Sequence, residues 1–126
     1  MKLRIRGNSL RLRLSRGEVN ELAERGRVDD GIAFGAGPDA RFGYSAVCAD
    51  DASLLSARLG AGSIVVTLPG SLARAWAASD DVGLEGEQPI GNGDVLRLLV
   101  EKDFACLTTR TGEDDTDAFP NPNVSC

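Results

Sequence analysis

The sequence contains no histidine. This removes the most common general base, the Ser-His-Asp triad and the most common zinc ligand together. The three cysteines form no C-x-x-C pair, so a structural zinc site is not expected. The glycine loops FGAGPDA and LGAGS match neither a Walker phosphate loop nor a dinucleotide fingerprint followed by a helix, and LGAGS is better interpreted as a hairpin turn. We therefore expect no metal site, no cofactor and no recognised catalytic motif.

Long apolar runs are also absent. No stretch approaches the ~20 residues that span a bilayer. The alternating start MKLRIR lacks the apolar run of about seven to fifteen residues found in a secretory signal. Cys48, Cys106 and Cys126 are an odd set without paired spacing, which is typical of reduced thiols. These features predict a cytoplasmic protein without membrane attachment, and 126 residues suit one domain.

Aromatic residues make up only 5% of the chain, so the core must be built from aliphatic side chains. Cys48 lies in the apolar run YSAVC and is expected to be a small buried side chain. Cys106 and Cys126 have Arg110 as the one nearby cation in sequence. A catalytic thiolate needs a cationic setting that lowers its pKa, so this role is not favoured.

The net charge of −5 hides a separation of charge along the chain. Six of the 14 basic residues precede the first acidic residue, Glu18. From Glu101 onward, six acidic residues stand against Lys102 and Arg110. The chain therefore begins with a basic block and ends with an acidic one.

The basic block has the pattern of a β-hairpin. Two runs, KLRIR and LRLRL, alternate hydrophobic and charged residues around the turn signal Gly7-Asn8. If the hydrophobic residues face inward, like charges line the outer face and repel one another across the strand pair. The outward residues are then Lys2, Arg4, Arg6, Arg11 and Arg13.

Two sources of negative charge could offset this face. One is internal, the acidic C-terminal segment. The other is an external phosphate or nucleic acid, for which arginine forks are well shaped. The pI near 4.7 and the few aromatic residues make nucleic acid the less favoured partner.

After the hairpin, Ser15 and Glu18 have the spacing of a helix capping box, and Gly26 is placed to end that helix. Two strands are expected to follow, one including Val28 and residues 32–34, the other over residues 41–48. A shift of 54 residues aligns the second half with the first: Leu10, Leu12 and Leu14 fall on Ile64, Val66 and Leu68. A second helix is expected to open at Pro69-Gly70-Ser71.

This pattern predicts an α+β fold of two pseudo-twofold, duplicated β-β-α-β units. The product would be a mostly antiparallel sheet or a small β-barrel with two short helices. The single α+β domain is assigned to residues 1–109, with repeat halves at about 2–50 and 54–104. Residues 110–126 form an acidic, proline-containing C-terminal tail. Its densest cluster, EDDTD, lacks the ligand spacing and glycine of a calcium loop and indicates a solvated or salt-bridged acidic loop.

Two resemblances support these assignments. The stretch SIVVTLPGSLARAW resembles the strand–proline–helix segment of the swapped-hairpin transcription-factor barrels, and only a fold is implied because Gly93-Asp94 comes too late for their pattern. The segments KLRIRGNSLRLRLSRGEV and VEKDFACL, with the tail EDDTDAFPNPN, resemble a family of small bacterial proteins of unknown function. That second resemblance implies a cytoplasmic bacterial protein and supplies no site residues.

Three hypotheses follow. The first is a non-catalytic binding or interaction domain, with a protein partner or a homodimer and with no membrane, whose partner-binding residues are those of the basic hairpin. The second is a nucleic-acid or phosphate-ligand binding module that uses the same face. The third is a small enzyme with Asp94, Glu101 and Asp103 as acid and base. The partner-binding residues are Arg4, Arg6, Arg11 and Arg13.

Overall fold

The computed structural model describes residues 1–105, 117, 119 and 120. These residues form eight strands and two α-helices, with a 3-10 turn at Pro38–Ala40. The elements are β1 (Lys2–Arg6), β2 (Ser9–Leu14), α1 (Arg16–Arg25), β3 (Arg27–Ala33), β4 (Arg41–Ala49), β5 (Ser56–Gly60), β6 (Ser63–Pro69), α2 (Gly70–Ala77), β7 (Gly83–Gly91) and β8 (Asp94–Lys102).

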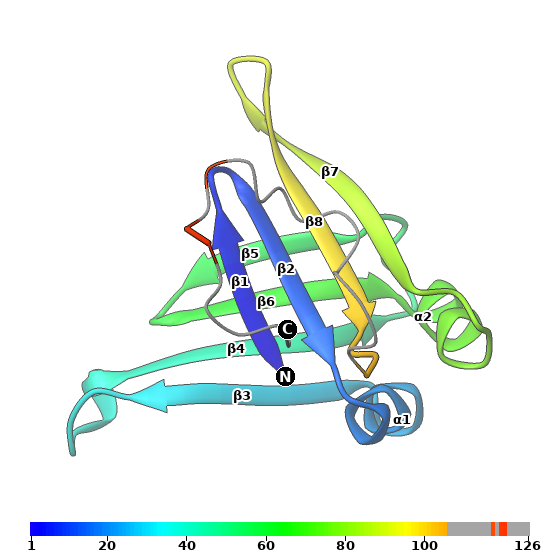
Figure 1. The fold of residues 1–126 in the computed structure, drawn as a ribbon, viewed down its shortest axis with the longest axis horizontal. Coiled ribbons are helices and arrows are strands. Elements are labelled where there is room, and N and C mark those ends of the chain that lie inside the picture. Colours follow the sequence, from blue (N-terminus) through cyan, green and yellow to red (C-terminus); the bar gives the residue numbers. More distant parts are fainter. Residues whose placement is uncertain (106–116, 118, 121–126) are drawn as a thin grey trace.

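The strands form two four-stranded sheets. The first sheet has the order β1-β2-β8-β7 and the second has the order β3-β4-β6-β5. Each combines two antiparallel hairpins through one central parallel pair, β2 with β8 and β4 with β6. The first sheet crosses in front of the second at a steep angle, and both helices lie at one side (Figure 1). The two sheets thus pack as crossed layers around a shared core.

The two halves of the chain have the same order of elements: hairpin, helix, hairpin. Adding 54 to the bounds of β1, residues 2–6, gives the bounds of β5, residues 56–60. The first hairpin of each half pairs with the second hairpin of the other half, so each sheet contains strands from both. An internal duplication is a plausible origin of this arrangement. The α+β class is confirmed, and each half has the order β-β-α-β-β, one strand longer than the expected unit.

The alternative of a small closed barrel is wrong for the described strands, which form two open sheets. Side-chain contacts hold two of the sheet edges together instead. The Gln88 amide of β7 accepts from the Ala57 N–H of β5 at 2.7 Å and donates to the Ala57 carbonyl at 3.0 Å. On the other side, the Tyr44 hydroxyl of β4 donates to the Met1 carbonyl at 3.0 Å.

Helix α1 begins and ends as its sequence predicts. The Glu18 N–H donates to the Ser15 hydroxyl, and the Glu18 carboxylate accepts from the Ser15 N–H, which completes the capping box. Gly26 closes the helix at φ 79°, a left-handed conformation that favours glycine. Helix α2 has no such side-chain cap: Pro69 is its N-cap and the last residue of β6, so the helix starts at Gly70.

The core lies between the sheets and under the helices. Its fully buried side chains are mostly aliphatic, as the composition predicts; the largest is Trp76 of α2. On β2, alternate residues Leu10, Leu12 and Leu14 are buried. Ile5 of β1 departs from the predicted inward set because it is 62% exposed. The largest buried side chains are Trp76, Leu12, Leu14, Leu22, Leu68, Val66 and Val100.

Candidate functional site

The outer face of the first sheet is strongly and unevenly charged. Every second residue of β2 is buried, as are Leu98 and Val100 of β8, so the residues that alternate with them point away from the core. The strand register places these outward residues in rows across β1, β2, β8 and β7. The rows are Arg6, Ser9, Arg97 and Glu87; Arg4, Arg11, Leu99 and Glu85; and Lys2, Arg13, Glu101 and Gly83.

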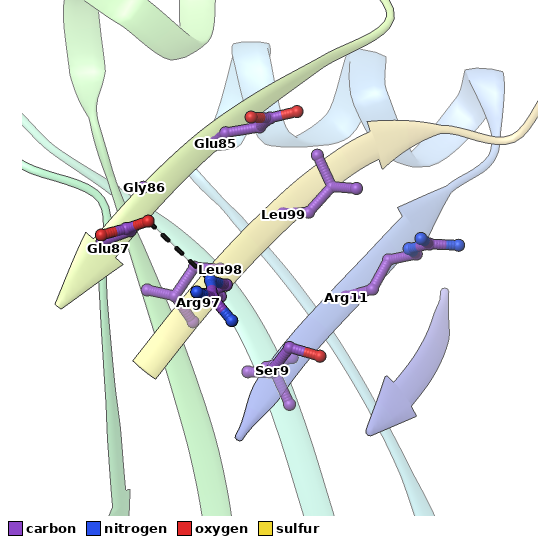
Figure 2. Close-up of a pocket in the computed structure, with 9 residues that line it drawn as sticks. Ser9, Arg11, Glu85, Gly86, Glu87, Arg97, Leu98 and Leu99 are labelled. Atoms are coloured by element: carbon purple, nitrogen blue, oxygen red, sulfur yellow. Dashed lines mark ion pairs between the residues drawn. The ribbon is translucent and has the colours of Figure 1, made fainter. Parts of the chain in front are cut away.

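This register creates two sides of opposite charge, which we name by their residues. The basic wall comprises the outward residues of β1 and β2. The acidic wall is Glu85 and Glu87 of β7. Strand β8 runs between them and contributes Leu99 at the centre, so that Leu99 separates Arg11 from Glu85 (Figure 2). The basic wall consists of Lys2, Arg4, Arg6, Arg11 and Arg13.

Part of the basic wall is neutralised within the domain. Arg13 binds Glu101 through Nε at 2.9 Å and Nη2 at 2.7 Å, and these side chains are 15% and 13% exposed. Arg11 Nε lies 3.6 Å from the same carboxylate oxygen. Lys2 Nζ is 2.9 Å from Asp103 Oδ2. The end of β8 and the residue that follows it therefore provide the charges that offset the first hairpin.

The acidic wall is less engaged. Glu87 Oε1 lies 3.8 Å from Arg97 Nε, and both side chains are largely exposed. Within the part of the chain that the structure describes, Glu85 has no cationic partner. Surface ion pairs of this kind contribute little to folding stability.

Two hollows open along this face. One of about 450 Å³ includes Ser9 and Glu87, and one of about 470 Å³ includes Gly83 and Glu101. Both hollows are lined by Arg11, Glu85 and Leu99, so they adjoin each other along β8. We call the two hollows together the charged groove.

Gly83 lies at the second end of the charged groove. A Cβ at this position would lie 2.7 Å from the Val100 carbonyl oxygen and 3.0 Å from the Glu101 Cβ. A side chain there would therefore press on the residue that holds Arg13. The close packing of β7 on β8 at this row therefore requires glycine.

The structure brings the predicted site residues together on one surface. Arg4 and Arg11 are directly opposite each other on β1 and β2, and Arg13 pairs in register with Lys2. Arg6 lies one row further, opposite Ser9. Their role in binding remains a prediction, but their common face is as expected.

The proposed enzymatic carboxylates do not gather. Asp94 begins β8 whereas Glu101 lies near its end, about 23 Å away at the rise of an extended strand. Glu101 and Asp103 are engaged with Arg13 and Lys2. Among the described residues, no cluster of three or more cysteine, aspartate or glutamate side chains could hold a metal ion.

Sequence reasoning missed the acidic wall and the apolar residue beside it. The stretch Leu84-Glu85-Gly86-Glu87 has the alternation of a half-buried strand, and this signal identifies both glutamates as outward-facing. Their position beside the basic hairpin depends on the pairing of β2 with β8, which no local pattern indicates. Leu99 was unremarkable because its strand contains leucine on both faces.

The cysteines and the acidic cluster EDDTD were the other candidate groups in the sequence. Cys48 is half-buried, with Sγ 3.7 Å from the Leu22 carbonyl oxygen. Burial raises the pKa of this thiol, so it is a packing residue rather than an activated nucleophile. Cys106, Cys126 and the acidic cluster at 113–116 lie outside the described residues, and Asp117 is exposed.

A second polar cluster joins the start of the chain to the domain. The Met1 ammonium donates to Glu18 Oε2 at 2.5 Å and to Asp30 Oδ2 at 3.1 Å. Burial opposes its charge, but these two hydrogen bonds and carboxylates outweigh burial and raise the pKa of the amine above 8.0. Every polar group of the cluster has a partner, so we assign it a structural role.

Comparison with known proteins gives a family but no activity. No curated protein and no solved structure matches the chain. Neither described helix has the length and apolar character to cross a membrane. A family model matches residues 1–123, nearly the whole chain, and confirms the expected resemblance to a family without an established activity. The chain belongs to DUF7009, a family of unknown function.

Proposed function

We propose that this chain is a non-catalytic binding domain and that the charged groove of the first sheet is its site. One observation carries the proposal: two adjoining hollows with cations along one side, carboxylates along the other and Leu99 between them. Exposed charges add little to folding, but they steer association and select partners. A protein surface is the partner class that offers both signs of charge and apolar contact together.

A phosphate- or nucleic-acid-binding module has less support. Lys2, Arg11 and Arg13 already have carboxylate neighbours in Glu101 and Asp103. A polyanion would have to compete with these pairs and would meet repulsion from the acidic wall. The enzyme alternative is weaker still, because its three candidate carboxylates are divided between the two ends of β8.

We further propose that the acidic tail, residues 110–126, is a second charged surface. Its carboxylates would face cations of the basic wall, within one chain or between two copies. The support is the separation of charge along the sequence, with six acidic residues from Glu101 onward. Glu101 and Asp103 already make such contacts, so the tail would extend an arrangement that begins at the end of β8.

The proposal is tested by recovery of partners with two matched double variants. Arg11→Ala with Glu85→Ala removes one cation and one carboxylate from the charged groove. Arg58→Ala with Glu21→Ala makes the same change in charge and composition at exposed positions outside it. Both variants should retain the wild-type melting temperature, because the groove change leaves the Arg13–Glu101 pair intact.

Each tagged protein is used to capture partners from lysate of the native host. The wild-type chain and the control variant should recover the same proteins, and the groove variant should lose them. Equal recovery by the groove variant would contradict the assignment of the site. Salt should weaken recovery by the wild-type chain, because screening shortens the range of these charges.

A further inference from the structure

We propose that the charged groove holds a segment of a partner protein in extended conformation. Its acidic side chains would point to the basic wall and its basic side chains to the acidic wall. This inference rests on the proposed function and specifies the partner's chemistry. Its basis is the shape of the groove, the opposite charge of its walls and the apolar Leu99 at the centre between them.

The groove follows the direction of one strand. Its two hollows succeed one another along β8, from the Arg97 row to the Glu101 row, and share Leu99. These rows are four residues apart, or about 13 Å at the rise of a β-strand. An extended segment of about four to six residues matches that length.

The width favours an extended segment over a helix. Arg11 and Glu85 lie in one row on strands that flank β8, so their backbones are about 10 Å apart. A helix with its side chains is about 10–12 Å in diameter, which is too wide to fit between the walls. An extended chain sends successive side chains to opposite sides, which lets it reach both walls at once.

The charges select an alternating sequence. Acidic side chains on one side of the segment would meet Arg11, whose contact with Glu101 is long at 3.6 Å. Basic side chains on the other side would meet Glu85, which has no cationic partner among the described residues. The peptide backbone would lie over Leu99, which is half-buried and is not part of the hydrophobic core. A segment with all its acidic residues on one side and basic residues on the other satisfies both walls.

Three blocked, dye-labelled peptides test this arrangement by fluorescence anisotropy with the full chain: GEKEKEKG, GEEEKKKG and GEEEEEEG. The first alternates charge, the second has the same composition in blocks, and the third is wholly acidic. At an ionic strength of about 0.01 M, the wild-type chain should bind the alternating peptide most tightly. The Arg11→Ala, Glu85→Ala double variant should bind it about fivefold to twenty-fivefold more weakly, and the Arg58→Ala, Glu21→Ala control should match the wild type.

A single substitution gives a change of preference that a misfolded protein would not show. Glu85→Arg reverses the charge opposite Arg11, at the centre of the groove, and leaves only Glu87 in the acidic wall, so this variant should prefer the wholly acidic peptide over the alternating one. Equal binding of the alternating and block peptides to the wild-type chain, or an unchanged preference in Glu85→Arg, would overturn the inference. Absence of binding by all three peptides would also overturn it. The proposed function would then still be judged by the partner-recovery comparison, which does not depend on these peptides.

Discussion

The two sheets share one framework but differ at their outer faces. Positions 54 residues apart occupy equivalent places in the two halves, yet most charged residues on the outer face of the first sheet have small or neutral counterparts in the second, the exception being Arg4, whose counterpart is Arg58. The second sheet therefore has no counterpart to the charged groove at these positions. The pairs are Arg11 and Val65, Arg13 and Thr67, Leu99 and Ser45, and Glu101 and Val47.

The inner faces show the opposite relation. At the same spacing, several pairs of residues are buried in both halves, although Val28 is buried and its counterpart Val82 is 56% exposed. Packing requires apolar side chains of suitable volume at these places, whereas the outer positions are free to differ. The buried inner residues, which the halves share, thus stabilise the fold, and the outer residues, which differ between the sheets, are those that we assign to binding. The buried pairs are Leu12 and Val66, Leu14 and Leu68, Leu22 and Trp76, and Ala46 and Val100.

The largest effect should come from the shared framework. Leu14 and Leu68 are equivalent residues, and each is 0% exposed. Leu14→Ala and Leu68→Ala should each lower the free energy of unfolding by about 2–5 kcal/mol, because each removes buried apolar surface and leaves a cavity. Urea denaturation of both variants checks this. A loss confined to one of them would contradict the equivalence of the two halves.

A smaller effect is expected where the sheets differ. Glu101→Ala leaves the mostly covered Arg13 guanidinium without its carboxylate and should cost about 1–3 kcal/mol. Removing both partners in a double variant should cost less than the sum of the single changes. Additive costs in this cycle would show that the pair does not offset the charge of the hairpin.

The contact between the edge strands β7 and β5 gives a third prediction. Gln88→Ala removes both hydrogen bonds to the β5 backbone at Ala57 and should cost about 1–2 kcal/mol. Hydrogen exchange at the Ala57 amide should become faster, while exchange in β1 stays unchanged. Unaltered protection at Ala57 would mean that Gln88 does not hold this edge.

The stability contributed by the ion pair between the Met1 ammonium and Glu18 depends on pH. Burial raises the pKa of Glu18, but hydrogen bonds from the Met1 ammonium and Ser15 outweigh this and hold it below the ordinary 4.5. Its contribution to stability is therefore present above pH 4.5 and lost as pH falls through the lowered pKa. The raised pKa of the Met1 amine contributes stability that is complete below pH 8.0 and is lost as pH rises through that raised value.

Glu18→Gln tests the acid side of this dependence and should cost about 1 kcal/mol near neutral pH. Glutamine keeps the capping-box hydrogen bond, so the variant isolates the charge. Thermal melts across acidic pH should show a flatter decline for Glu18→Gln than for the wild-type chain. Parallel pH profiles would contradict a role for this ion pair.

The smallest predicted effect concerns the acidic tail. Truncation after Thr109 should lower the free energy of unfolding by about 1 kcal/mol or less at low salt, and by less at high salt, because exposed charge contacts are screened. Thermal melts of the truncated and full chains at two salt concentrations measure this. An unchanged melting temperature at low salt would contradict the tail's proposed contact with the basic wall.

Local signals in the sequence predicted much of the framework. The hairpin periodicity, the Ser15–Glu18 capping box, the Gly26 helix end and the 54-residue spacing all concern neighbours or repeated patterns. The exchange of hairpins between halves was not predictable in this way. It pairs Arg13 with Glu101, 88 residues away, and such a choice depends on packing of the whole core.

The charged groove was half predicted for the same reason. The basic wall lies on one hairpin and follows from alternation alone, whereas the acidic wall comes from β7 and reaches it only through β8. The Gln88 contact with a strand edge likewise has no local signature, because glutamine occurs at many exposed positions. Partners close in sequence were found, and partners brought together by topology were not.

The central claim, that binding belongs to the first sheet and framework to both, is tested most directly by mapping a bound peptide. Amide chemical shifts of the isotope-labelled chain are recorded while the alternating peptide GEKEKEKG is added. Binding in the charged groove should change the shifts of residues 9–13, 83–87 and 97–101 and leave β3 to β6 unaffected. Changes centred on β3 to β6, or spread equally over both sheets, would contradict it.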